Sequence, residues 1–213
     1  MAALPFRVLL ITDAAACATR CRGVVDTVAR ALDGVDARQV AVLFRDKAAS
    51  PDKNLRAVAA LRSLCARSGA RVLIHTHVFM AMSLGLHGAH LASDALRAPG
   101  DVELARSLLA RGALLGVSAH AGDALPAGAD YALLSPVFPS TSKPADQRPL
   151  VGLDGLRAVC ATSPTPVVAL GGVDEENAPA CLAAGAQAVA VLGGVMGARD
   201  PSAALRRLLA ALG

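Results

Sequence analysis

The sequence reads PVVALGG at residues 166–172 and AVAVLGG at residues 188–194, two short apolar runs that each end in a glycine pair. Such runs, bounded by glycine, are typical of buried strands. A glycine pair directly after a strand presents backbone N–H groups without interference from a Cβ, which favours an anion. A tight turn alone explains one pair. Two pairs, Gly171-Gly172 and Gly193-Gly194, about one strand-helix unit apart predict a phosphate site.

Six further apolar runs precede these two, and longer segments of helical period alternate with all eight. The expected strands are residues 7–11, 39–44, 72–75, 88–91, 114–117, 131–134, 166–170 and 188–192. Helices are expected at 23–32, 55–68, 102–110, 153–160, 175–184 and 201–212, with a weak one around 122–127. The pattern predicts the α/β class and a single (β/α)8 TIM barrel, with residues 1–213 as one domain. A doubly wound sheet is the alternative, but the glycine motif it needs is missing after the first strand.

Composition narrows the functional classes. The chain has 213 residues, a net charge of +4 and 2% aromatic residues, so neither a basic block nor an aromatic platform for nucleic acid is expected. Pro179, Gln187 and several glycines interrupt the longest uncharged stretch, which argues against a membrane span. The start lacks an export pattern, and five scattered cysteines indicate free thiols in a reducing compartment. A cytoplasmic location is therefore expected.

Polar side chains gather where the predicted strands end, and a barrel brings these ends to one face. Histidine exchanges protons near neutral pH, so an acid/base role is expected among them. Arg45 and Lys47 lie two residues apart and offer paired cations to an anion, while Thr141 and Lys143 could clamp one from a long loop. For each of these residues, an ordinary structural or solvated role is the alternative. The residues at the strand ends are Asp13, Arg45, Lys47, His75, His77, His90, Ser118, His120 and Ser135.

The histidines also allow a different class of site. His75 and His77, together with His90 and His120, could chelate a divalent metal in a metal-dependent hydrolase. Such sites usually add a carboxylate at the barrel mouth, and the eighth strand ends without one. We therefore place this possibility behind a phosphate-binding enzyme that holds no metal.

The assembled motifs resemble the superfamily of thiamine phosphate synthase and the TenI-type thiazole tautomerase. They run nearly from end to end and include LITD at 10–13, FRDK at 44–47, GAHL at 88–91, GVSAH at 116–120, GADY at 128–131, SPVFP at 135–139, GLDGL at 152–156 and PVVALGG at 166–172. The resemblance implies a (β/α)8 barrel acting on a phosphorylated thiazole, with the glycine pairs, Ser118 and the Lys143 loop binding it. A homodimer is left open.

Departures from the family pattern separate its two activities. Synthases of this kind carry Asn-Asp-Arg after the third strand and an Asp after the fourth, and the two Asp residues hold Mg²⁺ on a pyrophosphate. Here these places are residues 75–77, which read HTH, and Ala95, with Asp94 beside it; Leu43 replaces a usual Gln. The resemblance thus implies first a tautomerase that moves a proton on a thiazole carboxylate phosphate, with His120 as acid/base and no cofactor. The alternatives are an Mg²⁺-dependent synthase, using Asp94 or Asp13, and a regulatory barrel that binds the ligand without turnover.

Overall fold

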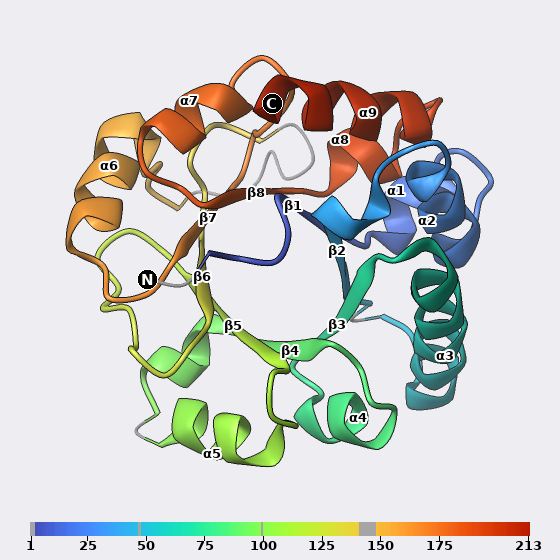
Figure 1. The fold of residues 1–213 in the computed structure, drawn as a ribbon, viewed down its shortest axis with the longest axis horizontal. Coiled ribbons are helices and arrows are strands. Elements are labelled where there is room, and N and C mark those ends of the chain that lie inside the picture. The colour runs from blue at the N-terminus through green and yellow to red at the C-terminus, as the bar shows by residue number, and fades with distance from the viewer. Residues whose placement is uncertain (1–2, 47, 99, 141–147) are drawn as a thin grey trace.

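The protein forms a closed barrel of eight parallel strands surrounded by helices (Figure 1). This structure is a computed structural model, and it describes residues 3–46, 48–98, 100–140 and 148–213. Each strand pairs with its neighbours in chain order, and β1 pairs with β8 to close the ring. The strands are β1 (Val8–Ile11), β2 (Val40–Phe44), β3 (Arg71–His75), β4 (Gly88–Leu91), β5 (Leu114–Ala119), β6 (Tyr131–Leu134), β7 (Val167–Leu170) and β8 (Ala188–Val191). The (β/α)8 architecture expected from the sequence is confirmed.

The helices cover the outside of the strands (Figure 1). They are α1 (Ala14–Ala18), α2 (Val24–Leu32), α3 (Pro51–Ser68), α4 (Val78–Ser83), α5 (Asp101–Leu108), α6 (Gly152–Thr162), α7 (Ala178–Ala183), α8 (Gly193–Met196) and α9 (Pro201–Leu212), with 3₁₀ turns η1 (Ala37–Gln39) and η2 (Ser93–Leu96). Side-chain caps start the two longest helices: Ser50 accepts from the Lys53 amide, and Asp200 accepts from the Ala203 amide. A proline follows each cap and suits the first helical turn.

One expected helix is absent. The chain between β5 and β6 has turns at Gly122 and Ala127 and no regular structure between them, because Gly122 has a φ of +85° and Pro126 has no N–H to donate. The short helices α1, α4 and α8 were not expected, and α3 begins four residues before its predicted start. Helices α1 and α8 have five and four residues, which is too short for a helical period to show in the sequence.

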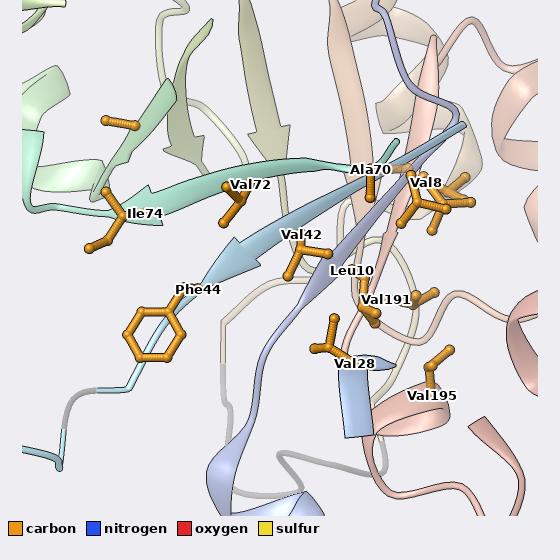
Figure 2. Packing of buried hydrophobic residues seen from close by; sticks show 14 of the residues in the cluster. Val8, Leu10, Val28, Val42, Phe44, Ala70, Val72, Ile74, Val191 and Val195 are labelled. Atoms are coloured by element: carbon orange, nitrogen blue, oxygen red, sulfur yellow. The ribbon is translucent and has the colours of Figure 1, made fainter. Parts of the chain in front are cut away.

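Alternation along the strands divides the buried side chains into two groups. Val8 and Leu10 of β1 point outward into the layer between strands and helices, where Val28 of α2 and Val195 of α8 also lie (Figure 2). Leu9 belongs to the second group, which fills the barrel interior. The two-residue periodicity of each strand therefore determines which side chains point toward the axis of the barrel. Where a strand ends, these inward-facing side chains lie at the open end of the barrel.

Two expectations from composition concern the chain as a whole. All five cysteines are free thiols in the structure. Within the described ranges, no helix combines the length and the apolar character that crossing a bilayer requires.

Candidate functional site

The carboxyl ends of the strands surround a cavity of about 270 Å³ at the end of the barrel that we call the mouth. This central cavity is lined by four of the predicted residues that end strands β3, β4 and β5: His75, His90, Ser118 and His120. Arg45, which follows β2, also lines it. Because parallel strands all end at the same face, residues far apart in the sequence meet here.

A second cavity of about 280 Å³ lies between the two glycine pairs. Residues 170–174 and 190–194 form most of its wall, together with Pro139 and Ser140. Leu170 and Leu192 line both this glycine cavity and the central cavity, so the two adjoin. The structure thus brings the predicted phosphate-binding glycines together, next to the histidines.

The amides of the four glycines are notable for their hydrogen bonding. Gly171, Gly172, Gly193 and Gly194 donate no hydrogen bond to any residue that the structure describes. Backbone N–H groups normally have a partner, so four together at the wall of a cavity suit an anionic ligand or water.

The two pairs differ in their steric requirements. Gly171 and Gly172 have φ values of +99° and +63°, and a Cβ on Gly172 would lie 2.3 Å from the Pro139 carbonyl oxygen. Glycine is therefore required at both positions of the first pair by the turn itself and by the close approach of residues 136–139. This agrees with the alternative that the pair forms a tight turn. A Cβ on Gly194 would meet no atom within 4 Å, so packing does not explain glycine at that position.

A third cavity, of about 600 Å³, lies beyond the ends of β2 and β3. It shares Arg45 and His75 with the central cavity and is also lined by Thr76 and His77. The buried Thr12 hydroxyl fixes the backbone of Arg45 by accepting from its amide at 2.8 Å and donating to its carbonyl at 3.1 Å. Three adjoining cavities therefore extend across the mouth, with Arg45 between two of them.

His90 is fully buried and uses both ring nitrogens. Its Nδ1 lies 3.1 Å from the Tyr131 hydroxyl and its Nε2 lies 2.9 Å from the Ser118 hydroxyl. Burial, with a smaller contribution from nearby His75, lowers the pKa of His90 to about 3. Burial also raises the pKa of Tyr131. Both side chains are therefore neutral at physiological pH, and His90 connects the barrel interior to Ser118 in the cavity wall.

His120 is held at the mouth by its ring and its backbone. Its Nδ1 donates to the Ser135 carbonyl at 2.9 Å, since a carbonyl oxygen only accepts, and its amide donates to the Asp123 carboxylate at 2.8 Å. This arrangement leaves the lone pair on Nε2. Arg148 Nη1 lies 2.8 Å from Nε2 and 3.0 Å from Nδ1, so the guanidinium sits against the imidazole ring. His120 thus presents an acceptor nitrogen beside a cation in the central cavity.

Several predicted residues are placed elsewhere. Asp13 does not line any of these three cavities; its carboxylate caps α1 by accepting from the Ala16 amide at 3.0 Å. His77 is separated from the central cavity and lines only the third. Lys47, Thr141 and Lys143 lie outside the described residues.

The structure adds residues that the sequence prediction omitted. Arg148 reaches His120 from the long segment after β6, where no local pattern marks it. Tyr131 could have been found by parity, because Tyr131, Leu133 and Ser135 alternate with residues that face the helices.

The histidines do not form the metal centre considered above. Among the residues that the structure describes, no group of three or more His, Cys, Asp or Glu side chains is arranged to hold a metal ion. The two nitrogens of His90 are occupied by Tyr131 and Ser118. The geometry therefore gives no support to a metal-dependent hydrolase.

The positions implied for Mg²⁺ fit that ion poorly. Thr76 and Ala95 replace the two expected carboxylates, and the Thr76 hydroxyl donates to the His75 carbonyl. Asp94, the suggested substitute, has a side chain that is 90% exposed and pairs with Arg97 at 3.4 Å. Mg²⁺ prefers carboxylate and other hard oxygen ligands, and no described Asp or Glu lines the central cavity. We therefore derive no reaction step through Mg²⁺.

Comparison with known proteins identifies close relatives. The family model described as "Thiamine monophosphate synthase" (TMP-TENI) matches residues 8–195. The thiamine-phosphate synthase of Thioalkalivibrio sulfidiphilus is 39% identical over 174 residues, covering 78% of this chain and 79% of that protein. A putative thiamine-phosphate synthase of Geobacter sulfurreducens is 40% identical over 80% of each chain. The solved thiamine phosphate pyrophosphorylase of Pyrococcus furiosus superposes with a TM-score of 0.79 at 30% identity, covering 98% of this chain and 96% of that one.

Proposed function

The chain belongs to the thiamine monophosphate synthase family, and from this membership we propose that it binds a phosphorylated thiazole at the mouth of the barrel. The observation that carries the proposal is the glycine cavity, whose four glycine amides find no acceptor among the described residues, directly beside the cavity of Ser118 and His120. The phosphate would accept from the glycine amides, and the thiazole ring would extend into the central cavity.

For the reaction, we propose first the synthase activity that the names of the relatives support, in preference to the tautomerisation that the sequence placed first. The thiazole nitrogen would form a bond to a pyrimidine methylene carbon while the carbon–oxygen bond to a diphosphate breaks. The diphosphate would leave as an anion. Arg45 and Arg148 line the central cavity and would hold its negative charge, as guanidinium groups bind phosphate oxygens well.

A second reaction has one specific observation in its favour. His120 lines the central cavity and keeps the lone pair of its ring on Nε2, and a proton transfer on a thiazole carboxylate phosphate would need that base and no metal. An anionic substrate would compete with His120 for Arg148 and so release Nε2. Among the residues that the structure describes, none that lines the central cavity carries a carboxylate, and such a wall suits this tautomerisation.

One pair of assays separates the two reactions. Purified protein is given thiazole phosphate and pyrimidine diphosphate, with and without Mg²⁺, and thiamine phosphate is measured. In parallel, deuterium exchange is followed on thiazole carboxylate phosphate with the wild type and with His120→Gln. We expect thiamine phosphate to form. Exchange that depends on His120, without any joining, would establish the tautomerase instead, and binding without either reaction would leave the regulatory role.

A further inference from the structure

Three aromatic rings, those of His75, His90 and Tyr131, form a row inside the barrel at one level of the sheet. His75 of β3 is in register with His90 of β4, which is in register with Gly116 of β5, and Gly116 with Tyr131 of β6. The ring centroids of His75 and His90 lie 5.8 Å apart, and those of His90 and Tyr131 lie 5.5 Å apart. His90 of β4 and Tyr131 of β6 are therefore in contact, although strand β5 lies between their two strands.

Gly116 makes this contact possible. A Cβ at Gly116 would lie 2.1 Å from the Tyr131 ring and 2.5 Å from Nδ1 of His90. Both rings occupy the space that any other residue on β5 would fill. Glycine is the residue that permits so close an approach, so the pair depends on one particular residue of the strand between them.

The hydrogen bonds of this group have a direction. The Tyr131 hydroxyl is fully buried, and Nδ1 of His90 is its one hydrogen-bond partner among the residues that the structure describes. If Nδ1 carried the ring proton, the Tyr131 O–H would be a buried donor without an acceptor, which is the costlier arrangement. Tyr131 therefore donates to Nδ1, and the proton of the neutral His90 ring lies on Nε2.

The same reasoning extends to Ser118. Since Nε2 of His90 carries a proton, it donates to the Ser118 oxygen across 2.9 Å. The Ser118 hydrogen must then point away from His90. Ser118 is partly exposed and lines the central cavity, so the hydrogen is available to a ligand there.

We propose that Tyr131 and His90 are positioning residues that make Ser118 a hydrogen-bond donor to an oxygen atom of the substrate, rather than a base or a nucleophile. This proposal rests on the proposed function, and it distinguishes the groups of the central cavity that donate hydrogen bonds to the substrate from the group that accepts one. Ser118 would join Arg45 and Arg148 in binding negative charge, whereas the lone pair of His120 Nε2 is the acceptor on the same wall. The geometry of the chain Tyr131 to His90 to Ser118 carries the proposal.

Nitrogen NMR of the full-length protein, labelled on its histidine rings, tests the direction without reference to turnover. His90 is assigned by comparison with His90→Gln. We expect the neutral tautomer with a proton on Nε2 and a bare Nδ1, unchanged across physiological pH, and a change of its signals in Tyr131→Phe. A proton on Nδ1, or a charged ring, would overturn the proposal.

Kinetics then separate positioning from simple support of the fold. On whichever of the two reactions the wild type catalyses, Ser118→Ala and Tyr131→Phe should each lower kcat by about tenfold, the value of one hydrogen bond. In the Ser118→Ala background, Tyr131→Phe should cost nothing further, because both act through one hydroxyl. Equal losses in both backgrounds would show that Tyr131 has a merely structural role. A wild type without either reaction would refute the proposed function, while the NMR result would still decide the tautomer.

Discussion

Arg148 Nη1 lies 2.8 Å from Nε2 of His120 and 3.0 Å from its Nδ1, which places a cation against a histidine ring that lines the central cavity. The arginine comes from the segment after β6, and the histidine from the end of β5. Both residues line the central cavity, so an anionic substrate bound there would compete with His120 for the guanidinium. The contact therefore joins substrate binding to the freeing of the proposed base.

Replacing this cation should weaken substrate binding. We expect Arg148→Gln, which keeps donor groups but loses the charge, to raise KM for the phosphorylated substrate about tenfold, since a charge-assisted hydrogen bond becomes a neutral one. Steady-state kinetics measure the change. The exposed Arg111, before β5, gives the control Arg111→Gln. An unchanged KM in Arg148→Gln would remove Arg148 from the binding site.

The two glycine pairs should respond differently to alanine. Gly172→Ala places a Cβ 2.3 Å from the Pro139 oxygen at a φ of +63°, so we expect it to destabilise the fold by about 3 kcal/mol. A Cβ at Gly194 is unobstructed, so Gly194→Ala should change stability by less than about 0.5 kcal/mol. Urea unfolding of both variants measures this difference. Equal destabilisation would mean that both pairs are needed for packing alone.

Buried neutral His90 should make the fold sensitive to acid. Its pKa is about 3 in the folded chain against an ordinary value of 6.5, so the unfolded chain binds the proton more readily. Stability is then fully present above the ordinary value and is lost as the pH falls toward 3. Between about pH 7 and pH 5 the loss attributable to His90 is about 2 kcal/mol.

Urea unfolding at a series of pH values tests this expectation. His90→Gln should remove much of the slope below the ordinary pKa, even though it lowers stability overall, while the exposed His77→Gln should keep the slope. A slope that is the same in wild type and His90→Gln would show that His90 does not cause the acid sensitivity.

The mouth should bind Mg²⁺ only when carboxylates are restored. We expect millimolar MgCl₂ to leave the melting temperature of the wild type unchanged and to raise that of Thr76→Asp/Ala95→Asp, because a bound ion stabilises the folded state. Thr76 has a φ of +63°, a conformation that Asp tolerates better than a β-branched residue. The uncharged Thr76→Asn/Ala95→Asn variant is the control. A specific rise in the wild type would contradict our reading of the donor set.

Sequence patterns predicted the barrel because its strands are short, apolar and separated by regular helical segments. All eight runs became strands, and the inward parity of β5 already places Ser118 and His120 on one side. The absent helix at 122–127 shows the limit of such patterns, since turn residues there outweigh weak periodicity.

The site was harder to predict than the fold. The strand ends locate His75, His90, Ser118 and His120 at the mouth, but the contact of His90 with Tyr131 depends on the empty space over Gly116, a relation between three strands. Arg148 reaches the cavity from a segment without periodicity. Asp13 follows β1 as a cavity residue would, yet a local cap on α1 occupies its carboxylate.

The central claim is that the mouth binds a phosphorylated thiazole through the glycine cavity. Calorimetric titration of the protein with the thiazole phosphate and with the unphosphorylated thiazole alcohol tests it most directly, with Gly194→Ala as the matched variant. We predict that the phosphate binds at least about tenfold more tightly than the alcohol, the worth of one or two added hydrogen bonds to charge, and that Gly194→Ala reduces this preference without unfolding the chain. Equal affinity for phosphate and alcohol in the wild type would contradict the claim.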